Sequence, residues 1–176
     1  MSVPVNPQAK GRVAFVLAAI AAAGATGIAT WQLLTTRPVT AGVAALAAGA
    51  ILLAADPTIF VPEARLERTV VSFVDRAYDG AILAAVAWAF RGTDPWIAVG
   101  ALVALGTSFL AAYVRARGAS LGYGVGESSI TRGFRYGLIS VGLLVDGLGW
   151  ALWTLASVMG LAALVRTSQV VKEERA

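Results

Sequence analysis

The sequence has no cysteine and no histidine, and it has few charged residues. The lack of cysteine excludes disulfides, thiolate nucleophiles and cysteine metal sites. The lack of histidine removes the commonest general base and a frequent zinc ligand. Any chemistry must therefore use carboxylates, arginine, lysine, tyrosine, serine or threonine.

Charged residues make up 14% of the chain, against about 25% in an average soluble domain. Hydrophobic residues make up 58% and form runs that approach or reach the roughly 20 residues a membrane helix needs. The predicted spans are residues 13–35, 38–55, 69–90, 95–114, 134–149 and 150–168. Only "GLGW" at 147–150 separates the last two, so either of them could be short or one could be re-entrant. The sequence predicts an all-α, polytopic membrane protein with a six-helix bundle at 13–168, between a segment at 1–12 and a tail at 169–176.

The positive charges provide a test of this count, because cytoplasmic loops collect lysine and arginine. If both termini are cytoplasmic, only Arg37 and Arg91 of the 14 basic residues fall on the outer side. The tryptophans all fall at the outer ends of spans, as in an aromatic belt: Trp31, Trp88, Trp96, Trp150 and Trp153. We therefore expect a multi-pass protein of the plasma membrane with both termini in the cytoplasm. Because the basic residues border spans, we expect no nucleic-acid partner.

Three charged residues interrupt the third span. The stretch "VVSFVDRAYDGAILAAV" at 70–86 contains Asp75, Arg76 and Asp79. A charge in the middle of a membrane helix costs about 2.5–3.5 kcal/mol on insertion scales, so such residues usually face the bundle interior. Asp75 and Asp79 share one helix face and could bind a divalent cation such as Mg²⁺. Spacing alone gives at least equal weight to an internal ion pair, because Arg76 can reach Asp79.

Four arginines surround the glycine-rich segment between the fourth and fifth spans: Arg115, Arg117, Arg132 and Arg135. Arginine offers paired donors to phosphate, so the set predicts an anion site. Ordinary enrichment of cytoplasmic loops in basic residues would explain one or two of them. Glu127, Ser128 and Ser129 are weaker candidates for the lining. Together with the two aspartates, the arginines predict a cytoplasm-facing cavity suited to a phosphate-bearing substrate and a metal.

These motifs carry a family resemblance. "VDRAYDGAIL" at 74–83, followed by "AAYVRARGASLG" at 111–122 and then by Arg132 and Arg135, resembles the CDP-alcohol phosphatidyltransferases, in particular the phosphatidylinositol-phosphate synthases of actinobacteria. The resemblance covers roughly residues 70–170. It implies a six-span homodimer with a wet cytoplasmic cavity, which transfers a phosphatidyl group from CDP-diacylglycerol to an alcohol and releases CMP.

The resemblance also implies roles for single residues. Asp75 would act as the catalytic base and as a ligand of Mg²⁺ or Mn²⁺, with Asp79 as a second metal ligand and Arg76 in support. The arginines that would bind the phosphate of the acceptor are Arg115, Arg117, Arg132 and Arg135.

The chain departs from the family's signature, which is D-x-x-D-G-x-x-A-R, a spacer, and G-x-x-x-D-x-x-x-D. The four aspartates of this signature hold two metals. If Asp75 matches the last aspartate, the other three fall on Ala50, Leu53 and Val71. None of these side chains can bind a metal, so three of the four family aspartates are not found.

A second register takes Asp75 and Asp79 as the last two aspartates, and the first pair then falls on Ala54 and Pro57. The half of the motif that would hold the CDP group is missing in both registers. Three other acidic residues lie nearby without a spacing that supports them as replacements: Asp56, Glu63 and Glu67. A two-metal mechanism needs metal ligands beside both the attacking oxygen and the leaving oxygen. Because this chain keeps at most two of the four aspartates, we expect its metal site to be eroded.

Three functions remain open on the sequence, and whether the chain is an enzyme is one of the open points. The first is an active transferase of phospholipid biosynthesis. The second, which the missing aspartates favour slightly, is a pseudoenzyme that binds a membrane lipid or phosphate, as a homodimer or paired with a related subunit. The third is a small transporter in which Asp75 and Asp79 carry an ion or proton, although no inverted repeat supports it.

Overall fold

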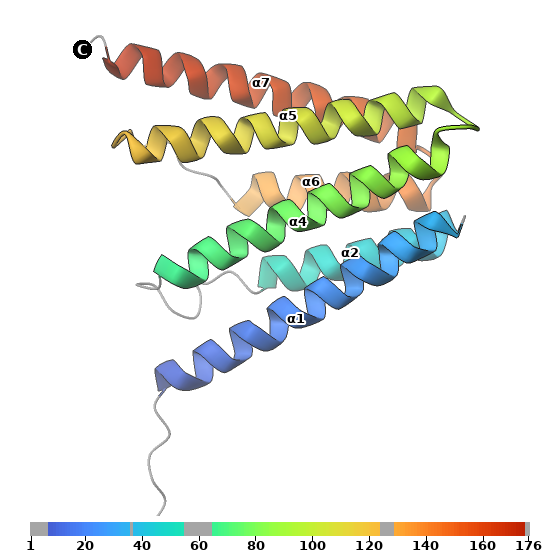
Figure 1. Ribbon diagram of the computed structural model, residues 1–176, viewed down its shortest axis with the longest axis horizontal. Coiled ribbons are helices and arrows are strands. Elements are labelled where there is room, and N and C mark those ends of the chain that lie inside the picture. Colours follow the sequence, from blue (N-terminus) through green and yellow to red (C-terminus); the bar gives the residue numbers. More distant parts are fainter. Residues whose placement is uncertain (1–6, 36, 55–64, 124–128, 175–176) are drawn as a thin grey trace, which may run out of the picture.

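The computed structural model describes residues 7–35, 37–54, 65–123 and 129–174. All regular structure in these residues is helical, which confirms the predicted all-α class. The six helices are α1 (Pro7–Leu34), α2 (Pro38–Ala54), α4 (Arg65–Phe90), α5 (Pro95–Ser120), α6 (Ser129–Leu144) and α7 (Leu148–Glu174). They run alternately between the two ends of an elongated bundle, so the start of α1 and the end of α7 lie at the same end (Figure 1).

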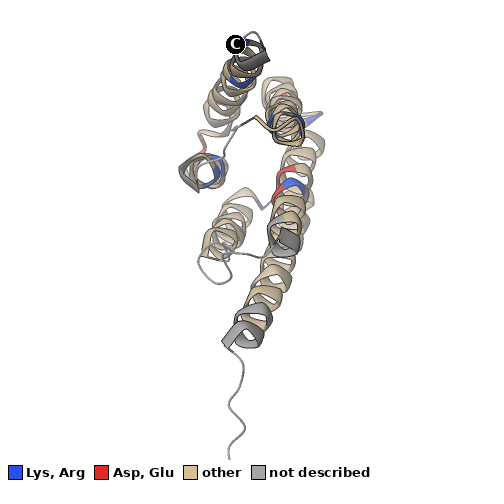
Figure 2. Cartoon of the chain, turned by 90° about the vertical axis from the view of Figure 1, so that its left-hand side faces the viewer, with Lys and Arg blue, Asp and Glu red and all other residues tan. Residues whose placement is uncertain are grey.

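In the part of the chain that the structure describes, three helices are long and apolar enough to cross a membrane by length and composition: Val13–Leu34 in α1, Pro95–Ser120 in α5 and Leu148–Lys172 in α7. α2 is a shorter apolar helix of 17 residues, and α6 has 16 residues. α4 contains the charged residues of the third predicted span. Charged residues occupy few places on the described helices (Figure 2). These features indicate a membrane protein.

The helix boundaries follow from local sequence. α5 begins with Pro95 directly after Asp94, whose carboxylate accepts hydrogen bonds from the backbone N of Trp96 at 3.0 Å and of Ile97 at 3.2 Å. Asp as N-cap followed by proline is a favoured helix start. The break between the last two helices lies at residues 145–147, slightly before the predicted position at 147–150. The reason is Asp146, whose φ of 56° ends the helix there, in a conformation that aspartate tolerates.

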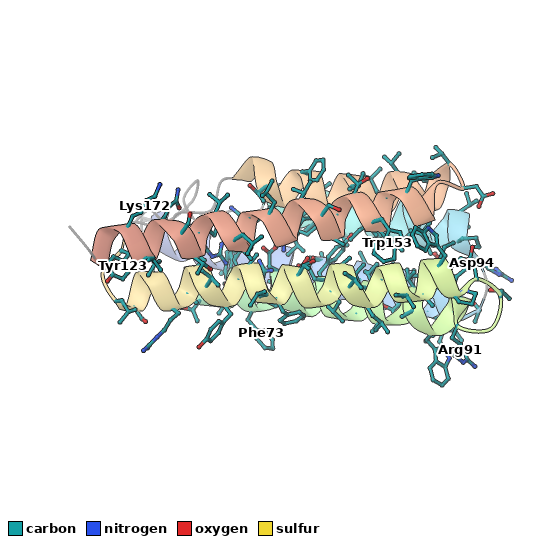
Figure 3. All side chains as sticks on the ribbon, turned by 90° about the horizontal axis from the view of Figure 1, so that it is seen from above. Phe73, Arg91, Asp94, Tyr123, Trp153 and Lys172 are labelled. Carbon is teal, nitrogen blue, oxygen red and sulfur yellow. The ribbon has the colours of Figure 1, made fainter. Side chains whose placement is uncertain are left out.

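The side chains at the two ends of the bundle differ. Arg91, Asp94 and Trp153 lie at one end, whereas Tyr123 and Lys172 lie at the other (Figure 3). At the first end the guanidinium of Arg91 lies 3.8 Å from the ring centroid of Trp88. The rings of Trp96 and Trp153 stack there with centroids 4.4 Å apart. The predicted clustering of tryptophans at one end is confirmed, since α1 and α4 end there and α5 and α7 begin there.

Small residues of α2 allow α6 to pack closely against it. A Cβ atom built on Gly49 would lie 2.7 Å from Cβ of Tyr136, and one on Gly42 would lie 3.0 Å from Cβ of Leu143. Both distances are too short for a normal contact, so only glycine fits at these positions without a shift of the neighbours. Small residues let membrane helices approach closely in this way, and the contact at Gly49 fixes the position of α6 at Tyr136.

Tyr78 ties three helices together next to the charged residues of α4. Its side chain is 1% exposed, and its hydroxyl donates a hydrogen bond to the carbonyl oxygen of Ala45 in α2 at 3.1 Å. Its ring meets the ring of Tyr136 in α6 edge to face, with centroids 4.8 Å apart, a favourable geometry for aromatic pairs. Tyr78 therefore aligns α4 with both α2 and α6.

Replacing Tyr78 by phenylalanine removes this hydrogen bond and keeps the ring. We expect the free energy of unfolding to fall by about 0.5–1.5 kcal/mol, the usual net contribution of one intramolecular hydrogen bond. Denaturant-induced unfolding in detergent micelles would measure the loss. Tyr113→Phe is the matched control, because Tyr113 is 65% exposed. Equal stability of the two variants would contradict a stabilising role of the bond to Ala45.

Candidate functional site

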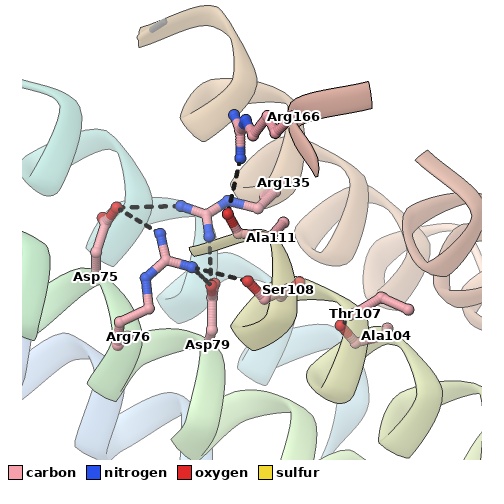
Figure 4. Close-up of polar contacts among 9 residues, drawn as sticks. All are labelled: Asp75, Arg76, Asp79, Ala104, Thr107, Ser108, Ala111, Arg135 and Arg166. Carbon is pink, nitrogen blue, oxygen red and sulfur yellow. Dashed lines mark hydrogen bonds and ion pairs between the residues drawn. The ribbon is translucent and has the colours of Figure 1, made fainter. Parts of the chain in front are cut away.

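Four charged side chains form a network between α4 and α6 (Figure 4). Arg135 of α6 donates from Nη2 to Oδ2 of Asp75 at 3.1 Å and from Nη1 to Oδ2 of Asp79. Nη1 of Arg76 lies 3.3 Å from the same oxygen of Asp79, and Nη2 of Arg76 lies 3.7 Å from Oδ2 of Asp75. Each carboxylate is therefore shared by two guanidinium groups.

The network is buried, as the cost of a charge in an apolar segment requires. Asp75 is 2% exposed, and Asp79 and Arg135 are each 1% exposed. Helical periodicity places Asp75, Tyr78 and Asp79 on one face of α4, and Ile82 continues this face into the core. The sequence prediction that the two aspartates face the interior is confirmed. The predicted ion pair from Arg76 to Asp79 is confirmed as well.

The side chain of Arg135 bridges the distance between α6 and α4. Among the described residues, no Cα atom of α4 lies within 8 Å of a Cα atom of α6, yet Arg135 reaches both aspartates of α4. Arg76 adds a contact to α5, because its Nη1 lies 3.5 Å from the carbonyl oxygen of Ser108. The charged network therefore links three helices, α4, α5 and α6, at one level of the bundle.

Two further arginines lie near this network. Arg166 of α7 donates from Nη1 to the carbonyl oxygen of Ala111 in α5 at 3.1 Å (Figure 4). Arg115 of α5 lies near enough to Arg76, Arg135 and Arg166 for their charges to repel one another. Among the described residues, two further guanidinium groups therefore lie beside the two carboxylates of the network. Guanidinium groups in a medium of low dielectric constant are favourable surroundings for an anion.

The site predicted from the sequence does not include Arg166, which is one of the basic residues expected on the cytoplasmic side. A signal was present, because Arg166 is the single charged residue between Leu148 and Val171. A lone charge inside an apolar run is a functional candidate by the same argument that singled out Asp75.

The structure separates the four arginines that the sequence grouped. Arg135 is buried against the aspartates, and Arg115 is half-buried on the side of α5 near Arg76. Arg117 is exposed near the end of α5, and Arg132 is half-buried near the start of α6. Several weaker candidates lie outside the described residues or have side chains outside them: Asp56, Glu63, Glu67, Glu127, Ser128 and Ser129.

The donor set does not fit the two-metal centre that the resemblance implies. Among the residues that the structure describes, no three acidic side chains lie together. Oδ2 of Asp75 and Oδ2 of Asp79 already accept from guanidinium groups. Oδ1 of each is buried and has no hydrogen-bond partner within the described part of the chain. A divalent cation at these oxygens would lie beside two guanidinium groups, and like charges repel strongly in a buried site.

Comparison with known proteins shows a likeness of fold to a solved structure. No protein-family model matches the chain, and no curated protein matches it. A similar solved structure is the crystal structure of the phosphatidylinositol phosphate synthase of Mycobacterium tuberculosis with CDP-DAG bound, which has 19% sequence identity and a TM-score of 0.66. The match covers 95% of this chain and 87% of the synthase chain. The resemblance to the CDP-alcohol phosphatidyltransferases predicted from the sequence is thus confirmed as a likeness of fold over nearly the whole chain.

Proposed function

We propose that this chain is a non-catalytic membrane protein with a CDP-alcohol phosphatidyltransferase-like fold, which binds the phosphate of a membrane lipid. The observation that carries this proposal is the contact of both Asp75 and Asp79 with the guanidinium groups of Arg135 and Arg76. In this arrangement the carboxylates are charge-compensated by the chain itself. A metal is therefore not required to neutralise the two carboxylates, and Asp75 is not available to act as a base on an acceptor alcohol.

Two arginines beside the network support the binding half of the proposal. Arg166 of α7 and Arg115 of α5 lie near Arg135, which already contacts both aspartates. Arginine binds phosphate through two parallel hydrogen bonds. A lipid phosphate at this level would receive donors from α5 and α7, and its acyl chains would remain in the bilayer. CDP-diacylglycerol is the first candidate, because the solved synthase of similar fold binds it.

In the proposed topology the chain crosses the plasma membrane six times, and both termini and the lipid-phosphate site face the cytoplasm. This topology is supported by the alternating directions of the helices and by the distribution of basic residues, which favour the cytoplasmic side of a membrane. α2 and α6 are short for a full crossing and are accommodated by local thinning of the bilayer. On the basis of the family resemblance, the proposed assembly is a homodimer or a pair with a related subunit.

The main competing function is an active transferase, which the likeness of fold to a CDP-DAG-bound synthase favours. An assay of CMP release from CDP-diacylglycerol, with Mn²⁺ and a panel of acceptor alcohols and their phosphates, separates the two. The proposal expects no release above a protein-free blank. Mn²⁺-dependent release that disappears in Asp75→Asn would establish the transferase and refute the proposal.

Lipid binding is tested by Arg166→Gln. We expect affinity for CDP-diacylglycerol or phosphatidic acid in nanodiscs to fall about tenfold, since losing one charge-assisted hydrogen bond costs about 1.4 kcal/mol or more. Native mass spectrometry would measure the bound lipid. Arg37→Gln is the control, because Arg37 is exposed at the opposite end of the bundle.

Competition with inorganic phosphate distinguishes a lipid phosphate from a free anion. If inorganic phosphate displaces the lipid at equal concentration, the site recognises the anion alone. If Arg166→Gln and Arg37→Gln bind lipid with the same affinity as the unchanged protein, the proposed site is wrong.

A further inference from the structure

We infer that the guanidinium group of Arg135 is the resident cation of this site: it serves in place of a divalent ion between Asp75 and Asp79, and it cross-links α6 to α4. The inference rests on the contacts of the network alone and does not depend on lipid binding.

The geometry of Arg135 is that of a bridging cation. One nitrogen bonds Asp75 and the other bonds Asp79, so a single planar group joins two carboxylates that lie one helical turn apart. Arg135 comes from a different helix and is 1% exposed. Arg76 contributes less to the bridge, because it belongs to the same helix as the aspartates, its side chain is 15% exposed and its distances are longer.

The position of the backbones supports the cross-linking role. In the described residues no Cα atom of α4 comes within 8 Å of a Cα atom of α6, so the two helices are connected through their side chains. Tyr78 and Tyr136 form one such connection through their rings, and Arg135 forms the charged one directly beside it. A metal held by aspartates of α4 would leave the two tyrosine rings as the connection to α6 at this level, whereas a cation carried by α6 itself adds a second one.

The charges explain why Arg135 excludes a metal. With Arg135 in place, two guanidinium groups balance two carboxylates. Without it, Arg76 is the one guanidinium group among the described residues that still forms an ion pair with Asp75 and Asp79. A space the size of a guanidinium then opens between the two carboxylates. Oδ1 of each aspartate is buried and accepts no hydrogen bond from any of the described residues. Carboxylate and water oxygens are ligands that suit Mn²⁺, so removing Arg135 should uncover a cation site.

The test is a Mn²⁺ titration followed by electron paramagnetic resonance, with the full chain in detergent. Unchanged protein should show no Mn²⁺ bound at Asp75. Arg135→Ala should bind Mn²⁺ at least tenfold more tightly than the unchanged protein. This gain should vanish in Arg135→Ala combined with Asp75→Asn. Arg135→Lys keeps a cation on α6 and should show no gain, and Arg37→Ala, which removes an exposed arginine, should show none either.

If Arg135→Ala does not fold, Arg135→Gln replaces it, because glutamine keeps volume and a donor but loses the charge; the same gain is expected. Two results would overturn the inference. The first is Mn²⁺ binding by the unchanged protein that disappears in Asp75→Asn; this result can be obtained without any Arg135 variant. The other is a folded Arg135→Gln or Arg135→Ala protein with no gain. Mn²⁺ bound at Asp75 in the unchanged protein would also count against the non-catalytic half of the proposed function, whereas the absence of a gain would not. Neither result bears on lipid binding, which Arg166→Gln tests separately.

Discussion

Arg135→Met is expected to lower the free energy of unfolding by about 3–5 kcal/mol, the range for removing one partner of a buried ion pair. Methionine keeps most of the side-chain volume but leaves Asp75 and Asp79 with Arg76 as their only guanidinium partner in the network. Both carboxylates are at most 2% exposed, so water cannot replace the lost donor easily. Denaturant-induced unfolding in detergent, with the helical circular dichroism signal as readout, would measure the change.

The matched control is Arg37→Met, which removes the same charge from an exposed position. Substitutions of this kind usually change stability by less than about 0.5 kcal/mol. A second variant, Arg135→Met combined with Asp79→Asn, removes one charge of each sign and keeps Asp75 beside Arg76, at 3.7 Å in the parent structure. We expect this double variant to be more stable than Arg135→Met alone. If the loss of unfolding free energy in the double variant equals the sum of the losses in Arg135→Met and in Asp79→Asn, the two charges do not interact.

Gly49→Leu is expected to destabilise the bundle by about 3 kcal/mol, at the upper end of the range for overpacking. A Cβ atom at Gly49 would lie 2.7 Å from Cβ and 2.9 Å from Cγ of Tyr136, and leucine adds three further carbon atoms. α2 and α6 must therefore move apart. Because Tyr136 is adjacent to Arg135 in α6, the displacement also moves the guanidinium away from the aspartates.

Gly106→Leu is the control for this prediction, since no described residue outside the adjoining turns of α5 has an atom within 4 Å of the Cβ position of Gly106. The same unfolding measurement applies to both variants. If Gly49→Leu is as stable as Gly106→Leu, the close approach of α2 and α6 does not contribute to stability. If Gly49→Leu is destabilised and gains Mn²⁺ binding, the position of α6 controls the network.

Local sequence was sufficient for the helices and for part of the site. Long apolar runs interrupted by proline, glycine and charged residues predict helices and approximate ends, because helix formation depends mainly on nearby residues. Periodicity places Asp75 and Asp79 on one face, and the cost of a charge in an apolar segment directs that face inward. The reach of Arg76 to Asp79 also follows from spacing within one helix.

Tertiary packing alone decided which residues complete the site. Arg135 is 56 residues from Asp79 and 60 from Asp75, and the sequence grouped it with the arginines of an anion site. A long guanidinium side chain can face either a loop or the bundle interior, and the choice depends on how α6 packs on α2 through Gly49. Arg166 joins the site for the same reason, since α7 packs along α5. The sequence by itself determined the helices and the inward face of α4, because these depend on neighbours along the chain; the partners of the aspartates depend on contacts between helices, which only the folded bundle brings together.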